Sequence, residues 1–346
     1  MAALPRITVL GSLNMDLVAY VSHHPAPGET MTADKFATST GGKGANQAVA
    51  CAKLSRPRPS SSSSSSGTAA TTTTAHVGMV GCVGDDSYGA LLRGNLARHG
   101  VDVSGVDARA GLKTGVALIV VDAPSGENRI ILSPEANHAV LPDDAAVAGI
   151  FLEPESTKKP DLLIMQLEIP LATVLAALAR AREAGVAVLL NPAPAQPLPA
   201  AAYAGLAHLV VNETEAALLG GVADSASLVP SVDAEKVPAA LRAVARAFVA
   251  KGVRNVVATL GSHGVFFLTA DGRSGLVPAE KVAAVVDTTA AGDTFVGAYA
   301  LEAVAAAAAG REFDVEAAVR KANRAAARTV ERAGAQDSIP WRDELV

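Results

Sequence analysis

Strand-like and helix-like segments alternate along most of this chain, and that alternation limits the possible folds more than any other feature. The apolar run "PDLLIMQLE" leads into the helical stretch "PLATVLAALARAREAG", and "LAHLVV" leads into "NETEAALLGG". Repetition of this kind predicts a mostly parallel sheet with helices on both faces. The runs "DLLIM" and "VAVLL" are apolar throughout, which is typical of strands covered on both sides. The expected class is therefore α/β, with a mostly parallel central sheet flanked by helices.

The same patterns assign most of the chain to individual elements. The strand-like runs 115–122 and 127–133, joined through "APSG", predict a hairpin. The valine-rich run before residue 287 is expected to be a further strand. The other expected strands cover 6–11, 76–84, 160–168, 186–192, 206–211, 253–261 and 264–272 with its turn, and the expected helices cover 44–54, 88–100, 170–185 and 212–221.

Composition excludes several classes of protein. The 346 residues fit one large α/β domain or two small ones, and half of them are apolar, as a folded core requires. The net charge of −5 gives no support to a nucleic-acid partner, whose footprint is a basic excess. No uninterrupted apolar run reads as a membrane span, and the N-terminus reads as a strand rather than a signal peptide. Cys51 and Cys82 are too few for a disulfide framework, so core cysteines in a reducing, cytoplasmic setting are expected.

One segment does not fit the alternation. Residues 55–75, "SRPRPSSSSSSSGTAATTTTA", are rich in Ser, Thr and Pro and nearly free of bulky apolar groups. Such a segment cannot offset its ordering entropy by burial. We therefore expect a mobile surface insertion between a helix and a strand, tolerated as a loop expansion.

Polar or glycine-rich groups follow five of the expected strands. They are Asn14 with Asp16, Glu168, Asn212 with Glu215, and the stretches "TLGSHG" and "DTTAAGD". Each one alone has an ordinary structural reading, as a turn former, a first-turn helix residue or a hairpin loop. Parallel sheets, however, bind ligands beyond the carboxyl ends of their strands. Their joint placement at one edge therefore predicts a functional site.

The stretch "DTTAAGDTF", residues 287–295, places small residues where the chain turns from the expected strand into a helix. Unpaired N–H groups and the helix dipole make a helix N-terminus an anion site, and small residues let a phosphate approach Ala290, Ala291 and Gly292. A carboxylate beside a phosphate is a poor binder, because like charges repel. Asp293 is therefore interpreted as a general base that takes the proton of an attacking hydroxyl, the alternative being a favourable first-turn helix charge.

Taken together, these motifs resemble those of the ribokinase-like (PfkB) carbohydrate kinases. The stretches "GGKGANQAVACAKL" (41–54) and "DTTAAGDTFVGAYA" (287–300) match the family's signatures, and "MQLE", "NPAPA", "NETE", "TLGSHG" and "GAQDSIPW" follow in the expected order. The resemblance covers the chain apart from residues 55–75. It implies Mg²⁺-dependent transfer of phosphate from ATP to a small sugar, with D-ribose at its 5-hydroxyl as the expected acceptor. No "GxxxxGK[ST]" motif is present, so a P-loop is not expected.

The resemblance also implies a role for each site residue. Sugar contacts are expected from Asn14, Asp16, Gly42, Lys43, Asn46, Glu168 and the base Asp293, a mixture of donors and charged acceptors that suits a polyhydroxyl ligand. The nucleotide is expected at Asn212, Thr259, Gly261, Ser262, Gly264, Gly292 and Asn323. Bacterial members usually carry histidine where this chain has Asn323, which bears on nucleotide affinity. Residues 290–292 would form the anion hole, and Glu215 would help to position Mg²⁺ through water.

A potassium ion is the second cofactor that the resemblance implies. The loops 287–289 and 329–338 are expected to lie side by side and to surround a monovalent cation, mostly through backbone carbonyls. The expected positions are Asp287, Thr289, Thr329, Arg332, Gly334 and Ser338. Carbonyl oxygens with a single carboxylate suit a large, weakly charged cation better than Mg²⁺. An alternative interpretation is that both loops are ordinary connections.

A small β lid over the sugar is also implied, formed by residues of about 14–42 and 112–136, and such lids often pair between two subunits. A homodimer is therefore expected, with His23 and His24 as surface or dimer-contact residues. Two other functions remain open. One is a kinase for deoxyribose, fructose or a nucleoside such as adenosine, although only 3% of the residues are aromatic, few for a base pocket. The other is a sugar-sensing relic without activity, which would be expected to lose the base or the anion hole.

Overall fold

A computed structural model describes residues 3–59, 73–152, 159–230 and 237–345. Its centre is a nine-stranded sheet with the strand order β13-β12-β11-β10-β9-β8-β1-β4-β5. All neighbours are parallel except β11 with β12 and β12 with β13, so the prediction of a mostly parallel sheet is confirmed. The strands are β1 (Arg6–Leu10), β4 (His76–Gly84), β5 (Asp102–Arg109), β8 (Leu162–Met165), β9 (Ala187–Leu190), β10 (His208–Asn212), β11 (Asn255–Thr259), β12 (Val265–Thr269) and β13 (Ser274–Val277).

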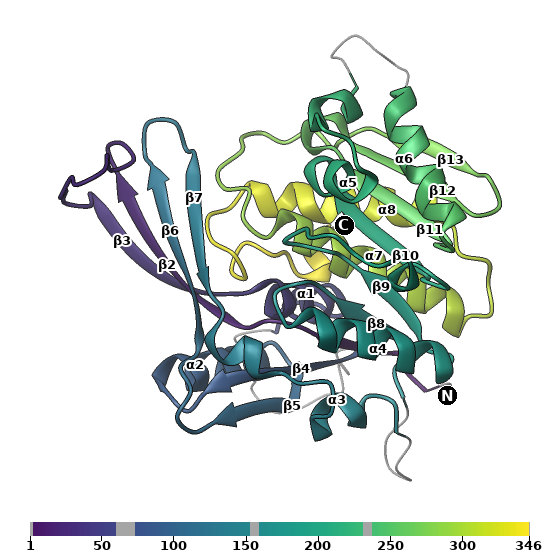
Figure 1. The fold of residues 1–346 in the computed structure, drawn as a ribbon, viewed down its shortest axis with the longest axis horizontal. Helices are drawn as coiled ribbons and strands as arrows, with labels where there is room; N and C mark the ends of the chain where they lie inside the picture. The colour runs from purple at the N-terminus through teal and green to yellow at the C-terminus, as the bar shows by residue number, and fades with distance from the viewer. Residues whose placement is uncertain (1–2, 60–72, 153–158, 231–236, 346) are drawn as a thin grey trace.

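Helices cover both faces of this sheet, and each face has its own core (Figure 1). One core combines Ile7 and Val9 of β1 with α1 (Lys43–Leu54), α2 (Ser87–Arg98), α7 (Ala291–Ala308) and α8 (Val315–Val330). The other combines Leu163 and Met165 of β8 with α3 (Ala145–Gly149), α4 (Leu171–Glu183), α5 (Glu213–Gly220) and α6 (Ala239–Ala250). Because successive side chains of a strand point to opposite faces, covering both faces requires apolar residues throughout.

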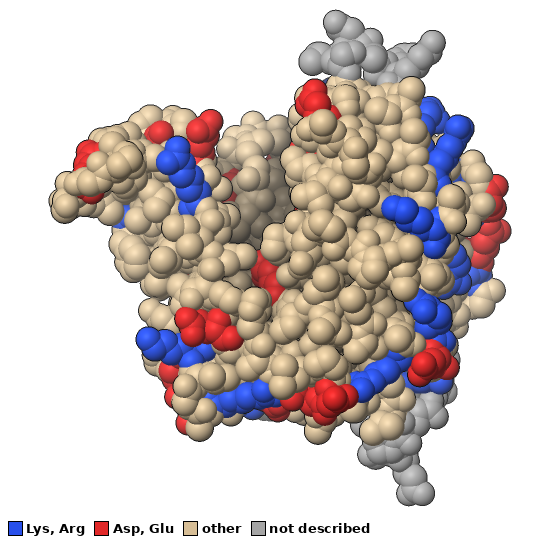
Figure 2. Space-filling model, in the orientation of Figure 1, with Lys and Arg blue, Asp and Glu red and all other residues tan. Residues whose placement is uncertain are grey.

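A second sheet of four strands projects from the body of the molecule (Figure 1). Its order is β3-β2-β6-β7, built from β2 (Asn14–Val21), β3 (Lys35–Gly41), β6 (Gly115–Asp122) and β7 (Asn128–Ser133). These strands lie within the two segments expected to form a lid, and β6 with β7 is the expected hairpin. A hollow separates this sheet from the body, and acidic side chains are recessed in it (Figure 2).

Three features differ from the sequence-based expectations. Residues 281–286 form no strand, so that prediction is wrong: Val285 and Val286 are exposed, and Val286 N–H donates to the Val330 carbonyl at the end of a helix. Thr329 belongs to α8 rather than to the loop expected at 329–338. The patterns also left β5, α6 and α8 unassigned, although α8 begins at Asp314, whose side chain accepts the Ala317 N–H as an N-cap.

The core of the predicted insertion, residues 60–72, lies outside the described residues. Its expected boundaries at 55 and 75 need correction, because both flanks are packed into the body. Ser55 and Ala75 are buried, and Thr74 N–H donates to the Ser55 carbonyl. Cys51 and Cys82 are buried free thiols, as expected for core residues. Among the described helices, none combines the length and the apolar content that crossing a bilayer requires.

Candidate active site

The site begins where the strand order reverses direction, between β1 and β8. Ser12 follows β1, and its hydroxyl donates to Glu168 Oε2 at 2.5 Å, just beyond β8. The same oxygen accepts the Lys43 N–H at 3.1 Å and the Asn14 side-chain amide at 3.4 Å. Doubly wound sheets open a crevice at such a reversal, because the chain leaves in opposite directions on its two sides. Glu168 thereby joins β2, the segment after β1 and the N-terminus of α1.

Gly42 is the residue that permits this approach. Its φ of 87° lies in the left-handed region that favours glycine, and a Cβ there would lie 2.6 Å from the backbone nitrogen of Asn14. A glycine therefore lets α1 begin directly against residues 12–14, which join β1 to β2. The consequence is that the α1 residues after Gly42 project into the site.

Asp16 is a buried carboxylate without a hydrogen bond to any described residue. Its side chain lies against the α-carbon of Gly41, where a Cβ would be 2.1 Å from Oδ2. Only 7% of its surface is exposed. Burial, reinforced by Glu168 and Asp293, raises the pKa of Asp16 to about 7. A buried acceptor left free in this way is suited to the hydroxyl groups of a ligand.

Asp293, in the first turn of α7, is held by two amides of α1. Asn46 Nδ2 donates to Oδ2 at 3.0 Å, and Gln47 Nε2 donates to Oδ1 at 2.9 Å. No described cation lies within salt-bridge distance of this carboxylate. Each carboxylate oxygen has two lone pairs, so both can still accept a proton while they keep these bonds.

Close packing of α1 against α7 sets this geometry. A Cβ on Gly297 would lie 2.5 Å from the Cβ of Ala50, and Cys51 Sγ lies 3.8 Å from the Gly297 carbonyl. The glycine brings the helices close enough for short amides of one to reach a carboxylate of the other. The contact connects core packing directly to the placement of Asp293.

The N-terminus of α7 has the features of an anion site. Ala290 is its N-cap and is one of two described non-glycine residues with a positive φ, at 60°. Such a conformation costs on the order of 1–3 kcal/mol and is typical of functional sites. The N–H groups of Gly292 and Asp293 have no hydrogen-bond partner among the described residues, and a Cβ on Gly292 would meet open space. The turn therefore presents free donors to an approaching anion.

A cavity of about 240 Å³ lies over this turn and contains several of the predicted nucleotide residues. Its walls include Lys43, Asn191, Asn212, Glu215, Thr259, Ala290, Gly292 and Asp293. Burial alone would lower the pKa of Lys43, but Asp293, Glu168 and Glu215 outweigh burial, so the pKa of Lys43 is raised. The cavity thus combines a fixed positive charge with the free N–H groups of α7. Asp16 and Glu168 do not line this cavity, although Lys43 and Asp293 do. The acids expected to bind the sugar therefore lie outside the cavity that contains the expected nucleotide residues.

Asn212 and Glu215 have a structural role as well as a place in the cavity wall. Asn212 Oδ1 accepts the Glu215 N–H at 2.8 Å, and Glu215 Oε2 accepts the Asn212 N–H at 2.9 Å, which is a capping box for α5. Burial raises the pKa of Glu215 despite these bonds. The described residues include no cluster of three or more acidic, His or Cys side chains that could bind a metal directly.

The remaining predicted nucleotide residues gather further along the sheet edge. Gly264, with φ of 90°, packs against the backbone of residues 277–279, and Asn323 of α8 donates to the Pro278 carbonyl at 3.1 Å. Gly261 and Ser262 are exposed in the turn before Gly264. The structure therefore brings Gly264 and Asn323 together on either side of Pro278.

The two loops expected to hold a cation meet at Asp287. Its Oδ1 accepts the Thr289 N–H and its Oδ2 accepts the Gly334 N–H, each at 2.9 Å. The side chains of the other expected residues point elsewhere: Arg332 pairs with Glu344, and Ser338 donates to the Ala335 carbonyl. The Thr329 hydroxyl donates to the Ala325 carbonyl. Asp287 is the only carboxylate among the residues expected around the cation, so the others could contribute only backbone carbonyls or hydroxyl groups.

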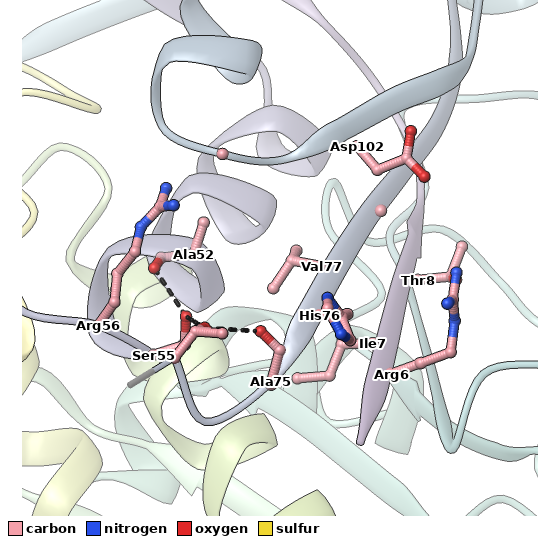
Figure 3. A pocket seen from close by; sticks show the side chains of 13 residues that line it. Arg6, Ile7, Thr8, Ala52, Ser55, Arg56, Ala75, His76, Val77 and Asp102 are labelled. Carbon is pink, nitrogen blue, oxygen red and sulfur yellow. Dashed lines mark hydrogen bonds between the residues drawn. The ribbon is translucent and has the colours of Figure 1, made fainter. Parts of the chain in front are cut away.

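Two further cavities, each of about 260 Å³, lie at the opposite, amino-terminal edge of the central sheet. Arg6, Arg56 and His76 line one of them, together with Thr8 and Asp102 (Figure 3). Neither cavity contains a residue of the site described above. The three cavities are therefore divided between the two edges of the sheet.

Several site residues were missed by the sequence-based assignment. They are amides and hydroxyls that link the assigned residues to one another: Ser12, Gln47, Asn137, Gln166, Asn191 and Gln336. Gln47, Gln166, Asn191 and Gln336 fall inside "GGKGANQA", "MQLE", "NPAPA" and "GAQDS", so the motifs contained a signal for them. What the motifs do not indicate is which partner each amide bonds.

Comparison with known proteins identifies the class to which this fold and site belong. The chain matches the pfkB family carbohydrate kinase model over residues 4–342. It is 44% identical to ribokinase of Schizosaccharomyces pombe, covering 96% of this chain and 94% of that protein. It is 37% identical to deoxyribokinase of Salmonella typhi, with coverages of 96% and 95%. The structure of Arabidopsis thaliana ribokinase complexed with ribose and ATP superimposes with a TM-score of 0.78 at 29% identity, over 99% of this chain and 98% of that one. The chain belongs to the pfkB family of carbohydrate kinases.

Proposed function

We propose that this protein is a ribokinase, which transfers phosphate from ATP to O5 of D-ribose and gives ribose 5-phosphate and ADP. The observation that carries the proposal is the buried carboxylate of Asp16, which has no hydrogen-bond partner among the described residues and is close enough to Glu168 and Asp293 for their charges to raise its pKa. Ribose offers hydroxyl donors to such acceptors, and bonds to charged acceptors are the strong ones. Ribokinase relatives at high coverage support the choice of sugar.

The residues divide the work between two sides of Asp293. Asn14, Asp16, Gly42, Asn46 and Glu168 hold the sugar so that its primary hydroxyl lies against Asp293. Asp293 accepts the hydroxyl proton as the oxygen attacks the terminal phosphorus of ATP, and the bond from that phosphorus to the leaving ADP oxygen breaks. The N–H groups of Gly292 and Asp293 and the charge of Lys43 stabilise the transferring phosphoryl group, whereas the N–H of Ala291 is already bonded to the Thr288 carbonyl. Thr259, the turn 261–264 and Asn323 position the nucleotide.

A panel of sugars and nucleosides assayed with ATP tests this proposal. D-ribose should give the highest kcat/KM, and 2-deoxy-D-ribose is the critical comparison, because a deoxyribokinase is among the relatives. The two sugars differ by one hydroxyl, so the ratio of their kcat/KM values measures how strongly the site uses it. A preference for deoxyribose, fructose or adenosine would replace D-ribose as the substrate, and no turnover with any of them would remove the kinase assignment.

Two cations fit the donor groups of the site, each in a different way. Asp287, which links the two loops by accepting the Thr289 and Gly334 N–H groups, is a single carboxylate, and one carboxylate combined with backbone carbonyls would suit a monovalent cation such as K⁺. The Glu215 carboxylate lines the cavity while bonded to Asn212, which suits contact with Mg²⁺ through water. Bound Mg²⁺ would supply positive charge for the phosphates of ATP, and bound K⁺ would supply positive charge beside Asp287. The chain's own part is to fix the turn 287–290, which leads into the free N–H groups of Gly292 and Asp293.

We expect K⁺ to raise kcat about tenfold over Na⁺ or Tris salts, because a fixed turn aims the N–H groups of Gly292 and Asp293 at the phosphoryl group. The measurement is turnover in matched salts at constant ionic strength. Asp287→Asn should remove most of this activation, whereas Asp34→Asn, an exposed carboxylate in the loop after β2, should not. A rate that is indifferent to K⁺ in a preparation shown to be free of it would contradict the expectation.

The second sheet is proposed to be a lid over the sugar that pairs with the lid of a second subunit. Strand register places Phe36, Leu118 and Ile131 on the face opposite Asp16, and all three are exposed. An exposed apolar face of this kind is typical of an interaction surface. His23 lies outside it, in the loop between β2 and β3, where it bonds Glu29.

Ile131→Glu should therefore convert a dimer to a monomer, because burying an unpaired charge costs several kcal/mol. Sedimentation at several concentrations measures the change. Leu141→Glu, an equally large change at an exposed leucine outside the second sheet, is the matched control. A monomeric unaltered protein, or a dimer that survives Ile131→Glu, would remove this face from the proposal.

A further inference from the structure

Gln336 is bonded to three other segments of the molecule, α1, α2 and β3, through its buried amide and backbone. Its Nε2 donates to Asn46 Oδ1 at 3.1 Å. Its Oε1 accepts from Asn95 Nδ2 of α2 at 2.5 Å and from the Thr40 hydroxyl of β3 at 3.0 Å. Its carbonyl accepts from the buried Lys53 Nζ at 3.1 Å. With only 2% of its surface exposed, Gln336 has little water with which to exchange these bonds.

The orientation of each amide in this network follows from the carboxylate at its end. An ionised Asp293 can only accept, so Asn46 must turn its Nδ2 toward Oδ2. Asn46 Oδ1 then faces away and needs a donor, which Gln336 Nε2 supplies. The opposite end of the Gln336 amide meets two donors, so the reverse orientation would set donor against donor. One arrangement alone satisfies all of these groups.

We propose that Gln336 is a positioning residue for the reaction. By fixing the Asn46 amide it holds the Asp293 carboxylate in the orientation in which it takes the hydroxyl proton. The inference rests on the proposed function, in which Asp293 is the base. A base must lie within hydrogen-bond reach of its proton, and a displacement of about 1 Å can cost 10²-fold in rate. Asn46 is one of only two described donors to Asp293, so losing its orientation frees half of the carboxylate.

The network also ties the base to two segments that lie outside the body of the site. Thr40 is near the end of β3, a strand of the second sheet, so the seating of that sheet is coupled to the Gln336 amide. Gly334, two residues before Gln336, donates to Asp287 in the turn that leads to α7. Gln336 therefore links β3 of the second sheet, through Asn46, to Asp293, and the same segment of chain contacts the turn before α7.

The sharpest test is Gln336→Glu. The new carboxylate still accepts from Asn95 and Thr40, but an acceptor oxygen replaces the donor to Asn46 and a negative charge is added. We expect kcat for the sugar to fall about 10–100-fold, with a smaller change in the KM for ATP. In the Asp293→Asn background, the same substitution should change kcat by less than about twofold, because the group on which it acts is absent. Thr40→Val, which removes one of two donors to Oε1 and leaves the bond to Asn46, is the matched control and should cost less than about threefold.

Each outcome separates the positioning role from its alternatives. An equal loss of kcat in both backgrounds would show a purely structural role and overturn the proposal. If kcat is near normal for Gln336→Glu but strongly reduced for Asp293→Asn, the positioning role of Gln336 is overturned and the proposed function stands. If kcat is near normal for Asp293→Asn, Asp293 is not the general base. Thermal melting and calorimetric sugar binding check that each variant is folded. Gln336→Met removes the donor without adding a charge, and its effect on kcat must also depend on the presence of Asp293. Failure of both Gln336 variants to fold would also overturn the proposal.

Discussion

Asp293→Asn is expected to lower kcat about 10²–10⁴-fold, the range usual for the loss of general-base catalysis. Asparagine keeps the shape of the side chain but cannot take a proton from the sugar hydroxyl. The binding of ATP and of the sugar should change little, because the groups predicted to hold them remain. Turnover at saturating concentrations of both substrates measures the first effect, and calorimetry of each ligand measures the second.

A second reading of Asp293 is that it is only a favourable charge in the first turn of a helix. Glu316→Gln tests that reading, because Glu316 is an exposed acid in the first turn of α8 that pairs with Arg320 and with no residue assigned to the site. Losing such a charge changes stability by about 0.3–1 kcal/mol. Equal, small effects of the two substitutions on kcat would assign Asp293 to the helix and not to the reaction.

The acids and glycines of the site were predictable because they fall in local motifs beside strand ends. Gly42, Glu168 and Asp293 each follow an apolar run or open a helix, and short-range patterns record that position. The amides between them were not predictable in the same way. Gln336 bonds Asn46 across 290 residues of sequence, and Gln47 bonds Asp293 across 246. The Gln47 pairing depends on how closely α1 packs on α7, and the Gln336 pairing depends on where the segment after α8 lies against α1. No local pattern encodes either arrangement.

The wrong strand before Asp287 has a related cause. A run of β-branched residues has the same local appearance whether or not a sheet edge is available to it. The β1 strand lies between β4 and β8, whereas residues 281–286 bond only the end of α8 and leave Val285 and Val286 exposed. Hydrogen-bond partners that lie far away in sequence, rather than propensity, decide which apolar run becomes a strand.

Asp16→Asn should raise the KM for the sugar about 10–100-fold and leave the KM for ATP nearly unchanged. A hydrogen bond to a charged group contributes about 1.5–3 kcal/mol, and the substitution removes the charge while keeping the shape. In the unaltered protein, the pKa of about 7 means that Asp16 loses its charge as the pH falls below 7. The kcat/KM for the sugar, which reports the free enzyme, should therefore fall below pH 7, and this limb should be absent in Asp16→Asn.

The same substitution is expected to stabilise the free protein, which separates it from general damage. The folded pKa of Asp16 lies above its ordinary value of 3.8, so the folded state holds the proton more tightly, and ionisation opposes folding. The cost is fully present above pH 7, falls as the pH drops from 7 toward 4, and is on the order of 4 kcal/mol for a difference from 3.8 to about 7. Asp16→Asn should thus unfold at a higher temperature than the unaltered protein at pH 8, with the gain fading near pH 4. Asp34→Asn, at an exposed site, should show neither the gain nor the loss of sugar affinity. A lower melting temperature for Asp16→Asn at pH 8 would mean that the carboxylate stabilises the fold. It would contradict the idea that the folded protein keeps a destabilising carboxylate in order to bind the sugar.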